Sequence, residues 1–599
     1  MLEALHLDGR ARVLRLRPGD GKDASGWTAT TPGLVWPDTS FAKPPAWIDA
    51  VVTAKGGAHP GKLELVSGGT WFYPTPASAP LLVAPPQPAP STTVQLLKVG
   101  DELAIFHDAA GWASNPKALV GAFIEAKKQA TAGRAFWAPG LGTPEDYALW
   151  AYLGVDWFDA SPLLLAAVRG QALTTDGPLD AATAARLMGG KTASAPWTTE
   201  QVLAHNLEAA RQELERVRHA IETGQLRSLV ERRIASKAAS VEILRRFDRE
   251  HKYLEAAAPS HREAVLPAMT VDALTIPEVA RFRDRLAGPY APPPLPILLL
   301  VPCSQRKPYK TSRSHRAFAR VLDASGIRHL VHEVMITSPL GLVPRELEEV
   351  YPAQAYDIPV TGHWLRDEEA IVRNQLAAIL GKGNYAHVVA HCGQGTFDVL
   401  RDLLPEDTRH TCLHHPTRHD DLQRLGAELA RLAPLVTGAN ATPRSERKLA
   451  DFRALLSFQF NAEVAATLCD GSEAHGRMPF VKLSRGGTQL GMTTIDRGVV
   501  SLTLDGAKAL AAAGIKRVRI GDFTPKKTST LFAVGVEGAD PDVRAGDEVA
   551  VVRRDGTLVG CGVAQMDAES MTHLKRGVAV ALRHILGEAP KPELQAVAA

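Results

Sequence analysis

Ile297-Leu-Leu-Leu-Val301 is an uninterrupted apolar run that leads directly into the polar segment Pro302-Cys-Ser-Gln-Arg-Lys-Pro-Tyr-Lys-Thr-Ser-Arg-Ser-His315. Short apolar runs that end in a polar loop are typical of buried strands in parallel sheets. Ligands of open α/β sheets bind outside the carboxyl ends of such strands. The sequence therefore predicts a sheet edge at which the polar side chains after Val301 converge.

Cys303 is the first reactive side chain after this strand, and basic residues follow it closely. Cations near a thiol favour its nucleophilic thiolate form. Lys307, Tyr309, Ser312 and His315 would lie at the same edge. On composition alone, a buried structural cysteine followed by a basic surface loop is the commoner arrangement, because most cysteines are small buried hydrophobic residues.

Length and composition limit the class of protein. At 599 residues the chain is too long for one hydrophobic core, so several domains are expected. With 45% apolar and 22% charged residues and no apolar stretch of the roughly 20 residues that a membrane helix needs, the chain is expected to have no membrane span. The N-terminus lacks the pattern of a secretory signal, so a cytoplasmic location is expected.

The five cysteines form no C-x-x-C pair, so reduced thiols are expected rather than disulfides or a zinc knuckle. No motif calls for a cofactor, and none is predicted. The net charge of +3 is too small to indicate nucleic-acid binding by itself.

Proline- and glycine-rich segments divide the chain, because consecutive prolines remove backbone donors and favour extended linkers. The predicted domains are residues 1–287, 288–440, 441–515 and 516–590. In the first domain, capping-box spacing at Thr198 and apolar residues alternating by four and three predict a helix that ends at Gly224.

Three further patterns predict the rest of the fold. Apolar runs at 297–301, 329–336, 387–390 and 410–413 alternate with helical segments, which indicates an open α/β sheet. The third domain is expected to be a small α+β domain. In the last domain, short strands with glycine punctuation predict a small β-barrel.

The spacing P-C-x-x-x-K-P-Y-x-x-S-x-x-H in residues 302–315 resembles the characteristic motif of the archaeosine synthase family, which is related to the archaeal tRNA-guanine transglycosylases. All seven fixed positions are filled. Tyr351-Pro352, the stretch from Tyr356 to Trp364 and the loop after Ile336 are similar to the same family.

The N-terminal 285 residues resemble the catalytic domain of archaeal tRNA-guanine transglycosylases at residues 153–161, 171–177 and 205–211. This resemblance implies a degenerate (β/α) barrel. The cysteine-rich zinc loop of the transglycosylases has no counterpart between residues 178 and 197. Base exchange by this domain is therefore not expected, and we expect it to serve as a scaffold or a tRNA-docking surface. Residues 577–584 and Gly546-Asp547 resemble a PUA domain, an RNA-binding module. The fold class is therefore α/β multidomain: degenerate barrel, central open α/β sheet, small α+β domain and C-terminal PUA β-barrel.

The archaeosine synthase resemblance implies a reaction on tRNA that carries 7-cyano-7-deazaguanine in its D-loop. Free lysine would add to the nitrile to give an amidine-linked adduct, and a partner radical-SAM enzyme would then cleave the adduct. We predict that Cys303 attacks the nitrile carbon to form a thioimidate, which the amine displaces. His315 would be the acid/base partner, because an imidazole titrates near neutral pH.

The remaining site predictions follow from position in the loops. Lys307 and Tyr309 would anchor a phosphate or the base edge, and Asp357 or Glu346 would receive the substrate ammonium. The wider set of predicted site residues consists of catalytic Ser312, substrate-binding His363 and Gln394, and RNA-binding Lys526, Lys527, Arg553, Arg554, Lys575 and Arg576. Lysine and arginine attract phosphates regardless of nucleotide sequence, but ordinary surface charge is the alternative for the basic residues.

Other functions stay open at this point. A transglycosylase that inserts the deazaguanine base and a noncatalytic tRNA-binding scaffold are the rival functions. A metal site formed by the histidines and cysteines between His391 and His415 is weaker, because their spacing matches no standard zinc site. The sequence does not choose between lysine, glutamine and ammonia as nitrogen donor, and analogy with the transglycosylases leaves a homodimer open.

Overall fold

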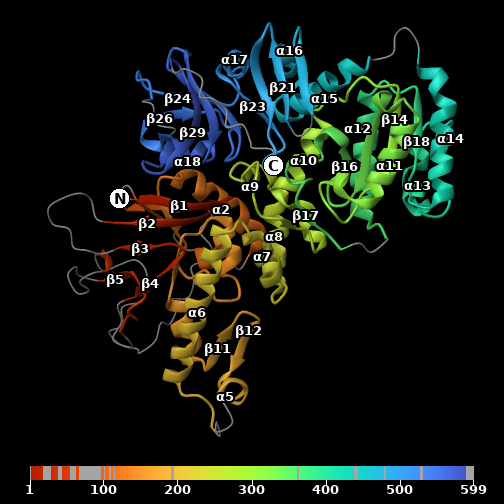
Figure 1. Ribbon diagram of the computed structural model, residues 1–599. Coiled ribbons are helices and arrows are strands. Elements are labelled where there is room, and N and C mark those ends of the chain that lie inside the picture. The colour runs from red at the N-terminus through yellow and green to blue at the C-terminus, as the bar shows by residue number, and fades with distance from the viewer. Residues whose placement is uncertain are drawn as a thin grey trace, which may run out of the picture. The chain divides into compact units, whose positions relative to one another are not determined.

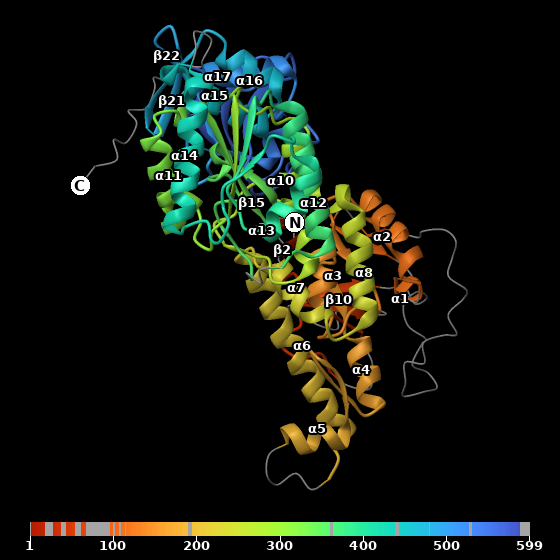
Figure 2. The same ribbon diagram turned by 90° about the vertical axis from the view of Figure 1, so that its right-hand side faces the viewer.

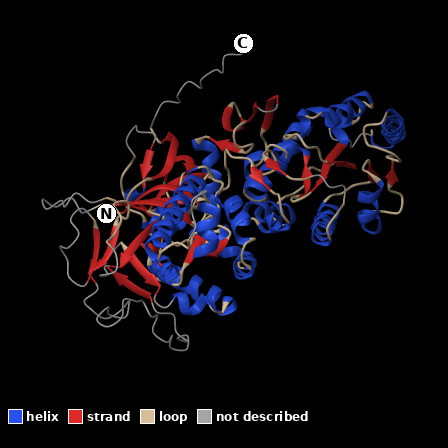
Figure 3. Cartoon of the chain, turned by 90° about the horizontal axis from the view of Figure 1, so that it is seen from below, coloured by secondary structure: helices blue, strands red, loops and turns tan. Residues whose placement is uncertain are grey.

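The computed structural model describes residues 2–17, 28–37, 43–53, 62–66, 96–99, 102–106, 109–113, 115–189, 195–359, 363–437, 443–477, 480–525 and 530–587. The chain forms two compact units (Figure 1). The first contains residues 1–259, 532–536 and 566–579, and the second contains residues 260–531, 537–565 and 580–599. The described chain contains both helices and strands (Figure 3). Among the described residues, no helix is both long and apolar enough to cross a bilayer.

The first unit contains a seven-stranded sheet in the order β6-β5-β4-β10-β9-β8-β7. Six of these strands run parallel, and β7 pairs antiparallel with β8 at one edge. Because the described strands leave β6 and β7 as edges, the sheet is an incomplete barrel rather than a closed one. This confirms the degenerate barrel expected from the sequence.

The strands of this unit are β1 Leu2–Asp8, β2 Ala11–Leu16, β3 Ala29–Thr30, β4 Gly33–Pro37, β5 Ala50–Thr53, β6 Leu63–Val66, β7 Leu96–Val99, β8 Leu103–Phe106, β9 Ala135–Trp137, β10 Trp157–Asp159, β11 Gln171–Thr174 and β12 Gly177–Asp180. Its helices are α1 Ala109–Ala113, α2 Pro116–Ala130, α3 Tyr147–Leu153, α4 Ser161–Val168, α5 Ala181–Met188, α6 Thr199–Glu222, α7 Leu226–Ile234, α8 Ala238–Arg249, α9 His251–Glu255 and, near the C-terminus, α18 Ala568–His573.

The helix predicted from Thr198 is α6, and its capping box is present. Asn206 on this helix is fully buried, and its side chain accepts the backbone N–H of Leu173 at 2.7 Å and donates to the carbonyl of Gln171 at 3.0 Å. A buried amide needs such partners, because an unpaired polar group costs about 1–3 kcal/mol. The bonds join two of the stretches that resemble the transglycosylases, residues 171–177 and 205–211.

The second unit is built around a five-stranded sheet in the order β16-β15-β14-β18-β19. Its members are β14 Ile297–Pro302, β15 Val331–Thr337, β16 Gly341–Pro344, β18 His387–Ala390 and β19 Arg409–His410. β14 lies in the middle and runs parallel to β15 and β18, while β16 is an antiparallel edge. A short parallel pair, β13 Leu266–Pro267 with β17 Tyr356–Asp357, lies outside this sheet. The open, mainly parallel sheet is confirmed.

Helices cover both faces of this sheet, with α11 and α14 on one side and α10 and α12 on the other (Figure 2). The helices are α10 Pro277–Ala287, α11 Arg313–Ala324, α12 Arg366–Lys382, α13 Gln394–Leu400 and α14 His419–Val436. The short 3-10 helices are η1 Val271–Thr275, η2 Tyr309–Thr311, η3 Arg328–Leu330, η4 Arg345–Leu347 and η5 Arg401–Leu403.

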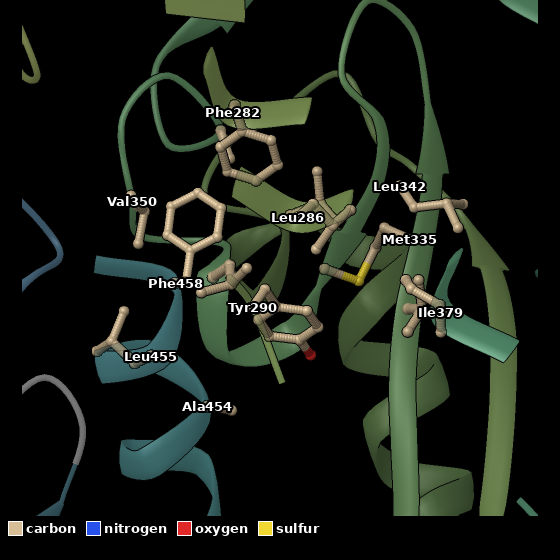
Figure 4. Close-up of a cluster of buried hydrophobic side chains, with 14 of the residues drawn as sticks. Phe282, Leu286, Tyr290, Met335, Leu342, Val350, Ile379, Ala454, Leu455 and Phe458 are labelled. Atoms are coloured by element: carbon tan, nitrogen blue, oxygen red, sulfur yellow. The ribbon is translucent and has the colours of Figure 1, made fainter. Parts of the chain in front are cut away.

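Because helices cover both faces, β14 is apolar along its whole length. Leu298, Leu299 and Leu300 are fully buried, and burial of each leucine side chain contributes about 1.5–3 kcal/mol. Aromatic and aliphatic side chains of α10, β15, β16, α12 and α15 pack together next to this sheet (Figure 4). This core fixes the position of the strand ends that carry the predicted site.

One predicted strand is shorter than expected. The run at 410–413 forms a strand only at Arg409–His410. Beyond it, both carboxylate oxygens of buried Asp421 accept backbone N–H groups, from Leu413 at 2.9 Å and from His414 and His415 at 3.1 and 3.0 Å. These donors are therefore not available to a sheet ladder, so the strand ends early.

A small α+β region follows, with α15 Arg444–Gln459, α16 Ala462–Cys469, α17 Leu504–Ala513 and the antiparallel sheet β20 Glu473–Arg477, β21 Phe480–Arg485, β22 Thr488–Thr493 and β23 Val500–Leu502. The last region is a six-stranded sheet in the order β25-β29-β28-β27-β24-β26. Its strands are β24 Arg517–Ile520, β25 Thr530–Phe532, β26 Val536–Ala539, β27 Glu548–Arg553, β28 Leu558–Ala564 and β29 Val578–Ile585, with η6 Ala533–Gly535 between β25 and β26.

Candidate active site

Cys303 lies at the carboxyl edge of the central sheet. It follows the last residue of β14, and its backbone N–H donates to the carbonyl of Ile336 on β15 at 3.0 Å. Cys303 is partly exposed, whereas the other four cysteines are buried. The strand end thus presents one accessible thiol at the edge where ligands of open α/β sheets bind.

Ser312 determines where His315 lies. Its hydroxyl oxygen accepts the backbone N–H of His315 at 3.2 Å, so Ser312 is the N-cap of α11. An N-cap serine satisfies a free donor of the first turn and contributes about 1 kcal/mol. His315, in that first turn, is buried. The contact of Ser312 is therefore a structural one within its own helix, and its catalytic role stays a prediction.

Three hydroxyl groups form a chain beside the strand end. The hydroxyl of Tyr356 lies 2.7 Å from that of Tyr309 and 2.5 Å from that of Thr337, the last residue of β15. Both tyrosine rings are buried, and burial raises the pKa of each phenol. These tyrosines are therefore neutral hydrogen-bonding groups at physiological pH.

Lys307 lies over the same cluster, with Nζ 3.9 Å from the centre of the Tyr356 ring. Partial burial lowers the pKa of Lys307, and negative charge on Cys303 and Asp357 acts in the opposite direction. The ammonium of Lys307 is thus close enough to Cys303 and Asp357 to interact electrostatically with both. Cys303, Lys307 and Tyr309 of the motif and Asp357 of a later segment come together here with Tyr356.

His315 is held by Arg345 rather than left free to titrate. Arg345 donates to His315 Nδ1 at 2.9 Å and is itself paired with Glu333 at 2.8 Å and Glu348 at 2.9 Å. Burial, together with the charge of Arg345, lowers the pKa of His315 to about 3. Because Nδ1 accepts a hydrogen bond, the proton of the neutral ring is on Nε2, a buried atom with no hydrogen-bond partner among the described residues.

This arrangement changes the expectation for His315. An imidazole with that pKa is neutral at pH 7, so it is not the group titrating near neutrality that the sequence suggested. It remains a neutral N–H donor next to the turn that leads to Cys303. Glu333 is correspondingly a carboxylate, because Arg345 and Arg328 outweigh its burial and lower its pKa to about 2.

Glu346 lies elsewhere. Its carboxylate accepts the hydroxyl of Tyr290 at 2.6 Å and lies 3.4 Å from the ring of His332. His332 pairs in register with Leu298 near the start of β14, and strands rise by roughly 3.3 Å per residue, so this cluster is more than about 10 Å along the strands from Cys303. The structure does not bring Glu346 to the strand end, and Asp357 is the acidic group that it does bring.

The other predicted residues are placed as follows. Gln394 is exposed at the start of α13 and donates to Asp398 at 2.8 Å, and His363 is exposed just before α12. Arg553 donates to Thr524 at 2.6 Å, and Arg554 pairs with Glu537. Lys575 is exposed and Arg576 is partly buried. Lys526 and Lys527 lie outside the described residues.

Several contacting residues had no role in the sequence-based interpretation. Tyr356 begins the stretch 356–364 that resembles the archaeosine synthase family, but no role was predicted for it. Its position next to Asp357, a predicted substrate-binding residue, was the one feature of the sequence that pointed to it. Thr337, Arg345, Glu333 and Glu348 reach the site from other elements. The spacing of these residues in the sequence does not predict that they meet at the site, because their contacts depend on the register of β15 against β14.

The histidines and cysteines after β18 and β19 do not form a metal site. His391 uses both ring nitrogens, with Thr411 at 2.9 Å and the carbonyl of Pro416 at 2.8 Å, and His410 contacts the carbonyl of Cys392 at 2.8 Å. Within the described ranges, no three histidine, cysteine or acidic side chains are grouped so as to hold an ion. His391, Cys392 and Cys412 are buried core residues, whereas His414 and His415 are exposed.

Two family models match parts of the chain. Residues 279–429, which contain the whole motif, match a domain of unknown function (DUF5591), and residues 526–586 match a PUA domain. The tRNA-guanine(15) transglycosylase of Methanothermobacter thermautotrophicus is 24% identical over 490 residues, which are 78% of this chain and 68% of that protein. Fold and site together define a transglycosylase-like α/β protein with a C-terminal PUA domain.

Two relatives specify the family. The archaeosine synthase subunit alpha of Methanosarcina acetivorans is 33% identical over 504 residues, covering 81% of this chain and 80% of that protein. The archaeosine synthase of Haloferax volcanii is 32% identical over 500 residues, covering 81% and 83%. The chain belongs to the archaeosine synthase family.

Proposed function

We propose that this protein is a tRNA-modifying enzyme that adds the side-chain amine of free lysine to the nitrile of 7-cyano-7-deazaguanine in the D-loop of tRNA. The observation that carries the proposal is the partly exposed thiol of Cys303 at the carboxyl edge of β14, with Lys307 and the Tyr309–Tyr356 hydroxyl pair beside it. Membership of the archaeosine synthase family supports this choice of substrate.

In the first step the thiolate of Cys303 attacks the electrophilic nitrile carbon. A C–S bond forms, the C≡N triple bond becomes a double bond, and the nitrogen takes up one proton to give a neutral thioimidate. Lys307 is the proposed proton donor, because its partial burial lowers the pKa of the ammonium and makes its proton easier to transfer.

In the second step the neutral amine of lysine attacks the thioimidate carbon. A C–N bond forms, the C–S bond breaks, and Cys303 leaves as a thiolate while the proton of the amine is returned to Lys307 or to the product nitrogen. The product is an amidine with the whole lysine attached. His315, neutral and fixed by Arg345, is proposed to stay neutral throughout rather than to exchange protons.

The rest of the chain is proposed to hold the tRNA. The PUA domain, with Arg553, Arg554, Lys575 and Arg576, would contact phosphates, and the incomplete barrel would serve as scaffold. A radical-SAM partner enzyme acting on the lysine adduct would complete the modified base. We propose that both steps occur in the cytoplasm, where the tRNA substrate is found.

The test uses the full-length protein and tRNA that carries the nitrile base. With lysine present, mass spectrometry of the digested tRNA should show a nucleoside heavier by one lysine. With lysine omitted and the reaction quenched in denaturant, a covalent protein–tRNA species should accumulate, because nothing displaces the thioimidate. An unmodified nitrile in the presence of lysine would refute the proposed activity. Product without any trapped covalent species, at times shorter than one turnover, would refute the covalent route alone.

A further inference from the structure

Arg283 on α10 is a partly buried arginine whose guanidinium is not matched by a carboxylate. It donates to the carbonyl oxygens of Leu274 at 2.7 Å and Pro339 at 3.2 Å. Among the described residues it forms no salt bridge, and burial lowers its pKa to about 10 although the charge of the neighbouring Asp284 acts in the opposite direction. By contrast, nearby Arg262 and Arg345 pair with Glu278 and Glu333. Arg283 therefore has a positive charge and N–H donors to spare.

The two carbonyls place Arg283 at the border of the candidate site. Pro339 lies in the turn between β15 and β16, two residues beyond Thr337, whose hydroxyl contacts Tyr356. Leu274 lies in η1, a few residues after β13, and β13 pairs with the strand that contains Tyr356 and Asp357. Arg283 thus joins the two segments that flank the Tyr356–Asp357 strand.

Phe282 and Leu286 on the same helix point into the core (Figure 4). They anchor α10, so the guanidinium is held in place by a rigid element. Two extended residues, from Thr337 to Pro339, span at most roughly 7 Å, which is comparable to the length of an extended lysine. A donor held at Arg283 by one end would therefore reach the hydroxyl cluster with the other.

Building on the proposed function, we propose that Arg283 binds the α-carboxylate of the free amino acid that donates the amine. A guanidinium is suited to this group, because two parallel N–H donors match the two carboxylate oxygens. The exposed carboxylate of Asp357 receives the α-ammonium. Charge complementarity at both groups leaves the side-chain amine directed to Cys303. The site thus selects an α-amino acid over a simple amine.

The test compares three donors in the full-length enzyme: lysine, 1,5-diaminopentane, which lacks the carboxylate, and 6-aminohexanoate, which retains it. Arg283→Gln should raise KM for lysine and for 6-aminohexanoate at least about tenfold, since a lost charge-assisted bond has that order of effect. The variant should change kcat/KM for 1,5-diaminopentane less than about twofold. Arg281→Gln, on the same helix, is the matched control and should behave as the wild type with all three donors.

Three outcomes would overturn the assignment. Equal losses with all donors would mean that Arg283 only ties Leu274 to Pro339, and an unchanged preference for lysine over the diamine would mean that it does not touch the donor. Weaker tRNA binding with unchanged KM for lysine would assign the guanidinium to a phosphate. If wild-type enzyme forms no lysine adduct, the proposed function itself fails. If the adduct forms and only the donor preference is insensitive to Arg283, the failure is limited to this inference.

Discussion

Three strands of the central sheet are followed by a cysteine at the same edge, one residue beyond β14 and two residues beyond β18 and β19, yet the surroundings of these cysteines differ. Cys303 after β14 is partly exposed and lies near Lys307. Cys392 after β18 and Cys412 after β19 are fully buried, and burial raises their pKa values to about 12 and about 11. The same residue type at equivalent strand ends thus forms an accessible thiol in one place and an inert core side chain in the others.

The neighbours explain the difference. At the ends of β18 and β19 the polar groups contact each other: the ring of His391 contacts the hydroxyl of Thr411, and the ring of His410 contacts the carbonyl of Cys392. The ring of Phe397 stacks on that of His410 with 4.2 Å between the ring centres. At the end of β14, the partly buried ammonium of Lys307 and the exposed carboxylate of Asp357 can accept further hydrogen-bonding partners, such as a substrate. A strand end becomes a candidate site where its polar groups are left incompletely paired, and becomes core where they are fully paired.

The largest effect is expected from Cys303→Ala. Removal of the nucleophile should lower the rate of lysine addition by at least about a thousandfold, ~4 kcal/mol of transition-state stabilisation. Cys392→Ala is the matched control and should retain near wild-type turnover per folded molecule. Single-turnover assays by mass spectrometry measure both. Full activity of Cys303→Ala would mean that the thiol after β14 is no more important for catalysis than the buried thiols after β18 and β19.

His315→Gln tests the fixed neutral imidazole beside β14. Because its pKa falls from the ordinary 6.5 to about 3 in the folded protein, the unfolded state binds more protons than the folded state between those pH values. The free energy of unfolding therefore decreases as pH falls through this range. The variant should have a shallower slope, by up to about 1.4 kcal/mol per pH unit.

Urea titrations between pH 4 and 7 measure this slope, with the exposed His475→Gln as control. The Glu333 carboxylate, held at a pKa of about 2, contributes in the same direction and should leave some acid sensitivity in the variant. An unchanged slope in His315→Gln would mean that the ring titrates normally, as the sequence alone suggested.

Cys392→Ser tests the buried strand end. The hydroxyl that replaces the thiol would be fully buried, so the protein should be destabilised by about 1–3 kcal/mol. Cys303→Ser, at the partly exposed position, should cost less than about 0.5 kcal/mol. Denaturant unfolding of the two variants gives the comparison directly. Equal effects would show that the two strand ends are equally buried.

The smallest effect is expected from Tyr356→Phe. This change removes one hydroxyl from the chain that links Tyr309 to Thr337 and should cost about 1 kcal/mol in stability and up to about tenfold in rate. Tyr385→Phe, whose hydroxyl contacts His332 near the start of β15, should have a comparable stability cost without the loss of rate. A loss of rate in both would point to a general effect on the sheet.

Local sequence features predicted the elements that local physics controls. The apolar run of β14 and the run of β18 were located correctly, and the capping box at Thr198 located the start of α6. Each depends on side chains within a few residues of one another. The strand at 410–413 was placed too far along, because Asp421, on the next helix, takes up its donors.

The sequence by itself determined the family and singled out Cys303, because the motif is continuous in the chain and its spacing defines a strand, a loop and a helix cap. Only the tertiary structure decided which polar groups meet that thiol. Tyr356 comes from β17, its hydroxyl contacts Thr337 of β15, and it lies close enough to Cys303 for their charges to interact, whereas Arg345 contacts His315. The register of β15 against β14 places the Glu346–His332 cluster near the start of these strands, away from Cys303. Burial, which depends on every element that packs around a side chain, likewise decided that His315 is neutral and that Cys392 and Cys412 are inert.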